Sequence, residues 1–229
     1  MHSQTSLLAR NRIVMLSNHV TVIDYGVGNL LSVQRGFEHC GARVIVSADA
    51  AQILTAERVV LPGVGAFGNA MKALERLGLI AVIRELAYRQ TPLLGICLGM
   101  QLLLDESEEF GITPGLGLIP GRVIPVPTQT QLGELQKIPH IGWSALGLSG
   151  APGGWEGTLM QDNRPGEAAY FIHSFMAVPT NPTHRIADCV YGGHPVPATI
   201  GRDHITGCQF HPEKSGEVGL KILRRFILE

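Results

Sequence analysis

The feature that most constrains the fold is an alternation of short apolar segments with helical segments in the first half of the chain. The apolar segments have the length of buried strands, and glycine-containing turns or residues at helical spacing follow them. Strands are predicted at residues 20–24, 43–46, 58–61 and 92–96, and helices at 30–40, 69–77, 79–89 and 98–105. This alternation predicts an α/β fold whose parallel sheet is covered by helices on both faces.

The second half of the chain has a different pattern. Strand-like segments follow one another with short turns at residues 122–126, 169–175, 187–191, 196–200 and 205–210, before one clear helix at 216–228. Residues 127–133 and 147–166 are predicted loops. Antiparallel strands in the C-terminal half, added to the parallel core, predict a central mixed and mostly parallel sheet.

Size and composition fit one large domain. The chain has 229 residues, of which 45% are hydrophobic and 16% charged, so it can bury a sizeable core. The formal net charge of -1 gives no reason to expect nucleic acid or an anionic membrane as a partner. No apolar run has the length of a membrane span, and the first residues lack the pattern of a signal peptide. We expect a cytoplasmic protein with an N-terminal tail at 1–19, or a true start at Met15, and one domain at 20–229.

Cys97 stands out from the other cysteines. The four are Cys40, Cys97, Cys189 and Cys208. Their spacing fits neither a zinc site nor a disulfide framework, so we expect reduced thiols, no metal site and no cofactor. Cys97 lies between Gly95 and Gly99, at a strand-to-helix junction, which is the pattern of a nucleophile elbow. Glycines are needed there because the turn is tight, and the helix N-terminus favours a thiolate. The pattern alone also fits a buried cysteine beside helix-packing glycines.

A thiolate needs a base, and the base needs an orienting group. His211-Pro-Glu213 follows the predicted strand at 205–210. In an extended segment, residues two apart point to the same side, so His211 and Glu213 can lie side by side. The carboxylate would then orient the imidazole and stabilise its cation. On its own this triplet also fits a surface turn. We assign the acidic run of Glu106, Glu108 and Glu109, which follows the predicted helix at 98–105, to a solvated face.

Hydrolysis of an amide through a thioester also needs an oxyanion hole. The backbone N–H of Leu98, next to Cys97, is one candidate donor. The glycine-rich turn that contains Gly63 and Val64 ends a neighbouring strand and is the candidate for the second. An ordinary strand-to-helix turn is the alternative.

Six segments, taken together, resemble one family. They are residues 24–30 (DYGVGNL), 61–67 (LPGVGAF), 95–101 (GICLGMQ), 138–143 (IPHIGW), 170–175 (YFIHSF) and 209–215 (QFHPEKS). In this order they resemble the glutamine amidotransferase subunit of imidazole glycerol phosphate synthase, from histidine biosynthesis, which is a class I amidotransferase. The resemblance covers nearly everything from Val20 onward. The elbow and the His-x-Glu pair are common to class I amidotransferases, and the other four segments are more specific.

The resemblance implies a single class I glutamine amidotransferase domain and a role for particular residues. Cys97 would be the nucleophile, His211 the general base and acid, and Glu213 the orienting carboxylate. Gly63, Val64 and Leu98 would form the oxyanion hole. The implied substrate contacts are Gln101, His173, Ser174 and Phe175, and the implied partner contacts are Asn29, His140, Trp143 and Lys214. Ser144 stands where the family usually has asparagine.

The function implied by the resemblance is hydrolysis of glutamine to glutamate and ammonia. The ammonia would pass to a (β/α)₈-barrel cyclase in a heterodimer, which makes imidazole glycerol phosphate and an aminoimidazole carboxamide ribotide. One alternative is a paralogue that feeds a different synthase, for example one that amidates a surface sugar. Another is a catalytically silent scaffold, against which the set of Cys97, His211 and Glu213 argues.

Overall fold

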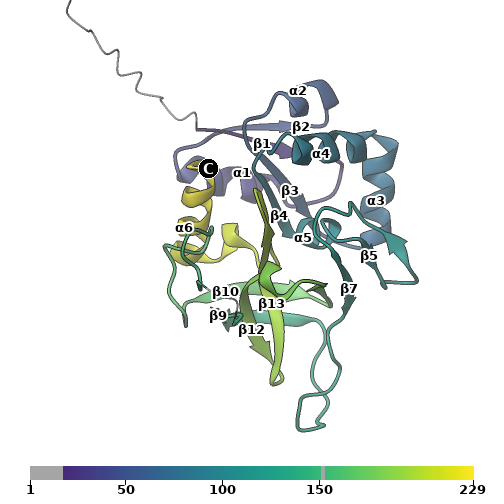
Figure 1. The fold of residues 1–229 in the computed structure, drawn as a ribbon, viewed down its shortest axis with the longest axis vertical. Coiled ribbons are helices and arrows are strands. Elements are labelled where there is room, and N and C mark those ends of the chain that lie inside the picture. Colours follow the sequence, from purple (N-terminus) through teal and green to yellow (C-terminus); the bar gives the residue numbers. More distant parts are fainter. Residues whose placement is uncertain (1–17, 151–152) are drawn as a thin grey trace, which may run out of the picture.

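The centre of the molecule is a mixed sheet of eight strands in the order β2-β1-β3-β4-β14-β13-β12-β9 (Figure 1). The computed structural model describes residues 18–150 and 153–229, so most of the expected tail at 1–19 lies outside the described residues. The strands are β1 (His19–Ile23), β2 (Arg43–Ser47), β3 (Val59–Gly63), β4 (Leu93–Cys97), β9 (Gly147–Leu148), β12 (Arg185–Tyr191), β13 (His194–Arg202) and β14 (Ile205–Cys208). The first five in the order run parallel and the last three are antiparallel. The predicted α/β fold with a mixed, mostly parallel sheet is confirmed.

Helices cover both faces of the parallel half of the sheet. They are α1 (Leu30–His39), α2 (Ala50–Leu54), α3 (Phe67–Arg76), α4 (Leu79–Tyr88), α5 (Leu98–Leu102) and α6 (Gly216–Ile227). Successive residues of a strand point to opposite faces, and the strands are buried on both. Val60 and Leu94 pack in one core with residues of α1 and α6. Val59 and Leu93 pack in a second core with residues of α3, α4 and α5.

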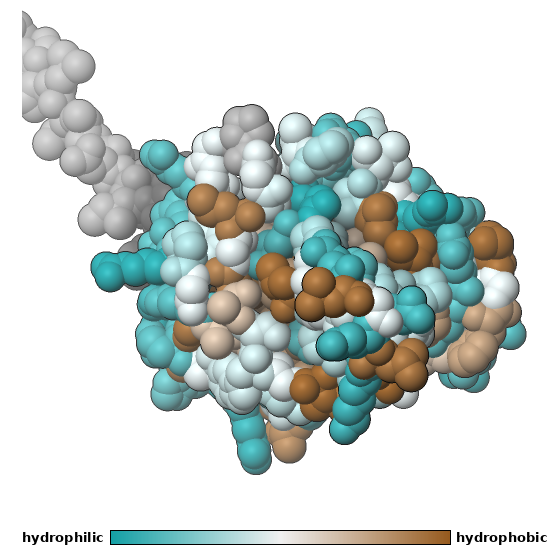
Figure 2. Space-filling model, turned by 90° about the horizontal axis from the view of Figure 1, so that it is seen from below, coloured by the Kyte–Doolittle hydropathy of each residue, from teal (hydrophilic) through white to brown (hydrophobic). Residues whose placement is uncertain are grey.

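The lower end of the molecule carries exposed apolar patches separated by polar surface (Figure 2). The loop 126–139 extends from this end, and its tip exposes Leu132 and Leu135 (Figure 1). Among the described residues, no helix combines the length and the apolar character that a membrane crossing requires.

Two smaller sheets hold the remaining strands. One pairs β8 (His140–Ala145) with β10 (Ala168–His173), and the other has the order β11 (Phe175–Pro179), β7 (Gly121–Pro125), β5 (Glu106–Ser107) and β6 (Thr113–Pro114). The prediction of one strand at 169–175 is wrong, because the chain leaves β8 and joins β7 at Ser174. The Ser174 carbonyl accepts a hydrogen bond from Val126 N there, at 2.9 Å.

Helix α5 is shorter than the predicted helix at 98–105. It ends at Leu102, and the next two amides make tighter bonds, Leu103 N to Met100 O and Leu104 N to Gln101 O. The carbonyls of residues 102–104 instead accept hydrogen bonds from backbone amides of the following loop, at residues 116–119. A tertiary contact therefore ends the helix, which local sequence does not reveal.

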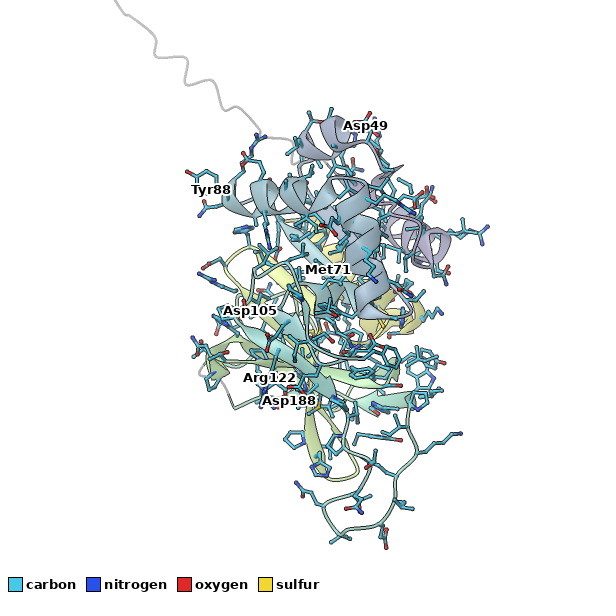
Figure 3. All side chains as sticks on the ribbon, turned by 90° about the vertical axis from the view of Figure 1, so that its right-hand side faces the viewer. Asp49, Met71, Tyr88, Asp105, Arg122 and Asp188 are labelled. Carbon is cyan, nitrogen blue, oxygen red and sulfur yellow. The ribbon has the colours of Figure 1, made fainter. Side chains whose placement is uncertain are left out.

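Several short elements lie outside the predicted ones. Strands β5, β6, β8 and β9 are absent from the prediction, and β9 lies in the predicted loop 147–166. Helix α2 begins after Asp49, whose carboxylate accepts hydrogen bonds from Ala51 N and Gln52 N as an N-cap, at the edge of the molecule (Figure 3). The 3₁₀ turns η1 (Pro182–His184) and η2 (Pro212–Lys214) precede β12 and α6. The second of these lies where an extended segment was predicted.

We predict that Gly99→Ala destabilises the fold strongly. A Cβ atom at residue 99 would lie 1.8 Å from the carbonyl oxygen of Leu61 in β3, a backbone atom that cannot move aside alone. The expected loss in the free energy of unfolding is about 2–3 kcal/mol or more. Gly68→Ala in α3 is the matched control, because the added Cβ meets only Thr113 Oγ1 at 3.7 Å. It should raise stability by about 0.5–1 kcal/mol. Urea denaturation measures both, and equal effects would contradict the close crossing of α5 over β3.

Candidate active site

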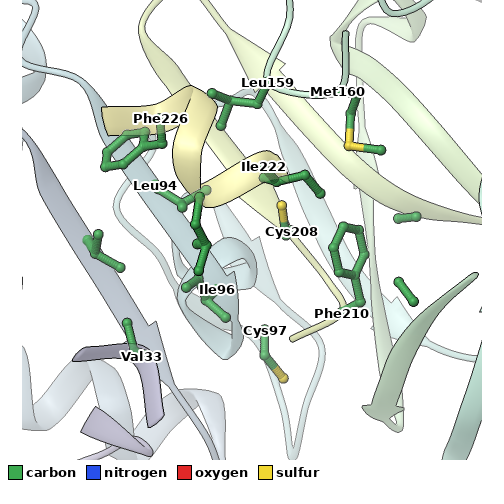
Figure 4. Close-up of a cluster of buried hydrophobic side chains, with 14 of the residues drawn as sticks. Val33, Leu94, Ile96, Cys97, Leu159, Met160, Cys208, Phe210, Ile222 and Phe226 are labelled. Atoms are coloured by element: carbon green, nitrogen blue, oxygen red, sulfur yellow. The ribbon is translucent and has the colours of Figure 1, made fainter. Parts of the chain in front are cut away.

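Cys97 occupies the sharp turn between β4 and α5. Its backbone has φ 55° and ψ −111°, a conformation that costs energy for a residue with a side chain. A Cβ at Gly95 would lie 2.7 Å from Gly99 O, so both flanking positions exclude a side chain. Figure 4 shows Cys97 at one end of the apolar cluster that contains Leu94, Ile96 and Phe210. The turn therefore has the strand-to-helix geometry of a nucleophile elbow.

His211 reaches Cys97 because β14 lies beside β4. The two strands are parallel with Cys208 opposite Ile96, so the segments that follow them leave the sheet at the same edge. His211 N then donates to Tyr170 O at 3.0 Å, which holds this segment against β10.

His211 and Glu213 contact each other across a turn. His211 Nδ1 lies 2.8 Å from Glu213 Oε1, and both side chains are buried. The predicted extended segment is wrong: residues 212–214 form η2, with Lys214 N donating to His211 O at 3.0 Å. Proline at 212 cannot continue a strand ladder, and the turn brings the two side chains together. Lys214, the last residue of this turn, is exposed.

The environment of His211 favours its cation. Burial lowers the pKa of His211, but interactions with the Cys97 sulfur and the Glu213 carboxylate outweigh burial and raise this pKa to about 9. In the described part of the chain, the buried Nε2 atom has no hydrogen-bond partner. The imidazole is thus held at one nitrogen and free to exchange a proton at the other.

A cavity of about 290 Å³ joins these groups to the predicted substrate contacts. Its lining residues are Val64, Gly65, Cys97, Leu98, Gln101, Glu109, Pro139, Ile172, His173, Ser174, Phe175 and His211. Gln101 comes from α5, and residues 172–175 come from the junction between β10 and β11. The structure therefore places all four predicted substrate contacts around one cavity with Cys97 and His211.

Glu109 also lines this cavity, and its assignment to a solvated face is wrong. It is half-buried, and its Oε2 accepts a hydrogen bond from Phe67 N, at the start of α3, at 2.6 Å. The turn after β5 folds back over the N-terminus of α3, a tertiary contact with no local signal in the sequence. Glu108 pairs with Arg122 at 3.2 Å, away from the cavity lining.

The three predicted oxyanion residues lie around the elbow. Gly63 at the end of β3 is the register partner of Cys97, and a Cβ there would lie 3.1 Å from Gly99 N and from the Leu98 side chain. Val64 and Leu98 line the cavity, and Val64 is 42% exposed. The turn after β3 thus lies against the N-terminal end of α5.

The predicted partner contacts differ in exposure. Asn29, which accepts from Ser32 N as the N-cap of α1, is exposed, as are Lys214 and Trp143. His140 is only 2% exposed: its Nδ1 lies 3.0 Å from His173 Nε2 and its Nε2 lies 2.9 Å from Ser144 Oγ. The structure therefore places His140 in the interior, and Ser144 is its hydrogen-bonding neighbour.

Two buried histidines contact each other at the cavity, and His173 is the one that lines it. Burial lowers the pKa of His140, and burial also lowers the pKa of His173 to about 4, although the Phe175 carbonyl acts in the opposite direction. His173 Nδ1 lies 2.8 Å from Phe175 O. Both imidazoles are therefore neutral at pH 7.

The proteins to which this chain is similar agree with the geometry of the site. The family model "Glutamine amidotransferase class-I" matches residues 21–229. Imidazole glycerol phosphate synthase subunit HisH 1 of Legionella pneumophila (strain Lens) is 49% identical over 208 residues, covering 91% of this chain and 98% of that protein. Subunit HisH of Geobacillus thermodenitrificans is 46% identical and covers 91% and 94%.

Solved structures share the fold at low sequence identity. A crystal structure of a glutamine amidotransferase has a TM-score of 0.67 at 16% identity and covers 91% of this chain and 96% of its own. PurLQS from Thermotoga maritima has a TM-score of 0.65 at 19% identity, with coverage of 92% and 97%. The family match across residues 21–229 and the identity to HisH proteins show that the chain belongs to the class I glutamine amidotransferases, and among these enzymes to the HisH subunits of imidazole glycerol phosphate synthase.

Proposed function

We propose that the chain hydrolyses L-glutamine to glutamate and ammonia as the glutaminase subunit of imidazole glycerol phosphate synthase, in histidine biosynthesis. The observation that carries this proposal is the meeting of the Cys97 elbow with the His211–Glu213 pair at one cavity. The relatives at 44–49% identity are HisH subunits of that synthase, which supports the choice of pathway.

The chemistry follows from these positions. His211 takes the proton of the Cys97 thiol, and the sulfur attacks the side-chain carbonyl carbon of glutamine. His211 then gives the proton to the departing nitrogen, which leaves as ammonia, and a thioester remains. Water attacks the thioester with His211 as base, and the sulfur leaves with the proton. Glu213 stabilises the imidazolium, while backbone N–H groups at Leu98 and at the turn of Gly63 and Val64 stabilise the oxyanion.

The cavity also offers groups for the α-amino and α-carboxylate ends of glutamine. Glu109 is the one carboxylate among the lining residues and suits an ammonium group. Gln101 and the backbone around Ser174 also line the cavity and supply further polar groups. Selection of glutamine would therefore depend on residues from α5, the turn after β5 and the β10–β11 junction.

We further propose a cyclase partner, a (β/α)₈ barrel that forms a heterodimer with this chain and receives the ammonia. Four exposed apolar side chains support a docking face at the cavity mouth, and we call them the apolar rim: Val64, Ile141, Trp143 and Ile172. Val64 and Ile172 line the cavity, and Ile172 is the register partner of Ile141 in β8. A partner that covers this rim would bury it and keep ammonia from solvent.

A paralogous role with another synthase remains the alternative, and co-purification separates the two. The native chain, purified from its own cells, should carry a barrel-type cyclase. A different synthase in its place would retain the glutaminase chemistry and refute the histidine pathway.

We predict that Cys97→Ala abolishes glutamine-dependent synthesis by the complex and leaves ammonia-dependent synthesis intact. The sulfur is needed only to release ammonia, so added ammonium salt bypasses it. A diazo-ketone glutamine mimic should label Cys97 and spare Cys40, Cys189 and Cys208. Burial raises the thiol pKa of all three, to about 12 for Cys189 and Cys208. Loss of both activities in a folded variant would show that Cys97 is structural.

Glu213→Gln should slow glutamine hydrolysis by roughly tenfold to a thousandfold, and His211→Ala should slow it more. The carboxylate orients and stabilises the imidazole, whereas the imidazole itself moves the proton. Steady-state kinetics of both variants in the complex measure the difference. Equal and complete losses, with unchanged unfolding curves, would assign Glu213 a direct role in proton transfer.

Lys214→Ala should weaken the partner interaction without changing the chemistry. Lys214 is exposed directly after the buried Glu213, so its cation can pair with an acidic group on a partner. Partner affinity or partner-stimulated turnover should fall, while alkylation of Cys97 in the isolated chain keeps its rate. The matched control is Lys72→Ala, which removes an exposed lysine of α3. Normal complex formation by Lys214→Ala would leave Lys214 as an ordinary surface charge.

A further inference from the structure

Gln209 is a fully buried amide directly beside the nucleophile. It follows β14 and is 0% exposed. Its backbone N–H donates to Ala198 O at 2.8 Å, which fixes the residue against β13. Its side-chain Nε2 donates to Cys97 Sγ at 3.8 Å, and its Oε1 accepts from Gln101 Nε2 at 2.9 Å. Both ends of the amide are therefore engaged, one with the sulfur and one with a residue of the cavity wall.

A backbone carbonyl fixes the direction of this amide. Phe175 O can only accept, so Gln101 must turn its NH₂ group toward it, at 3.0 Å. The other N–H of the same NH₂ group meets Gln209, which must present its oxygen. The NH₂ group of Gln209 is then left to face Cys97. A flipped Gln209 would set two NH₂ groups against each other and a carbonyl oxygen against the sulfur.

The same carbonyl is also held from the other side. His173 Nδ1 lies 2.8 Å from Phe175 O, so this nitrogen carries the proton and donates. With two donors, both lone pairs of the Phe175 oxygen are used. A series of hydrogen bonds thus runs from Phe175 O through Gln101 and Gln209 to the Cys97 sulfur. Its starting point is fixed by β10, β11 and α5 together.

We propose that Gln209 is a positioning residue for the nucleophile: its NH₂ group holds the sulfur of Cys97 at the cavity and favours the thiolate. The inference rests on the proposed role of Cys97. A neutral donor stabilises an anionic sulfur more than a thiol, because a hydrogen bond to a charged acceptor is the stronger one. Gln209 is uncharged, so it favours the anion without adding a charge that glutamine or glutamate would meet.

The other groups around the sulfur are the Ile172 carbonyl, which accepts from Cys97 Sγ at 3.9 Å, and three titratable side chains. His211 and Glu213 approach from η2. Tyr25, at the end of β1, donates to Pro62 O at 2.7 Å, and burial followed by the charge of Cys97 raises its pKa. None of these contacts changes when Gln209 loses its donor, so a substitution at 209 isolates the amide.

The test is the pH profile of Cys97 alkylation by iodoacetamide in the isolated full chain, followed by mass spectrometry of the peptide that contains Cys97. Gln209→Met keeps the length of the side chain and removes the donor. We expect the rate at pH 7 to fall about tenfold, and the pH of half-maximal rate to rise by about one unit, with the wild-type rate restored at high pH. Loss of packing alone would change the rate at every pH.

A matched control is Thr199→Val. Thr199 is also 0% exposed, lies in β13 opposite Cys208, and donates to Met160 Sδ at 3.6 Å. This variant also removes a buried donor to sulfur, but not one to Cys97, so its alkylation profile should match wild type. A profile for Gln209→Met that superimposes on wild type overturns the proposal.

Two further measurements keep the test decisive. If Gln209→Met fails to fold, Gln209→Leu replaces it. This side chain also lacks a donor and carries no charge, so the half-maximal pH must still rise, and an unchanged value overturns the proposal. Glutaminase activity is measured separately in the wild-type complex. Its absence would refute the proposed function, whereas the alkylation profile reports on Gln209 alone.

Discussion

The active-site end of the molecule depends on how closely α5 crosses β3. Only a hydrogen atom fits at residue 99, because a Cβ there would meet the Leu61 carbonyl oxygen at 1.8 Å. This approach lets the chain turn within one residue, and Cys97 takes the strained conformation that results. The turn after β3 is pressed against the same helix end, so the candidate oxyanion donors and the sulfur share one rigid frame. Segments from distant parts of the sequence, such as residues 172–175, complete the cavity around this frame.

The buried histidines at and beside the cavity differ in the charge state that their surroundings favour. His211 and Glu213 are buried together, and the pKa of His211 rises because interactions with the Cys97 sulfur and the Glu213 carboxylate favour its charged form. His140 and His173 are equally buried but have only neutral hydrogen-bond partners, so burial lowers their pKa values. The same side-chain type is thus suited to carry a proton at position 211 and is neutral at positions 140 and 173. What differs is the charge of the neighbouring group.

Local patterns in the sequence predicted the parts of the fold that local physics determines. The strand–helix alternation of the first half, and the glycines around Cys97, reflect periodicity and sterics within a few residues. The break at Ser174, the early end of α5 and the role of Glu109 in the cavity wall depend on tertiary contacts and were missed. The contact between Gln209 and Cys97 joins residues 112 apart in sequence, and no local pattern marks it. The pairing of His211 with Glu213 was expected in an extended segment, whereas a proline turn produces it.

The strand order has a consequence for synthesis on the ribosome. Among the described strands, β14 comes last in the chain, yet it lies in the middle of the large sheet, between β4 and β13. Until it emerges, the parallel and antiparallel halves each present an unpaired inner edge, and such edges invite aggregation. Insertion of β14 closes both edges and at the same time brings His211 beside Cys97. A nascent chain therefore brings its candidate catalytic residues together in the same step that pairs these two strand edges.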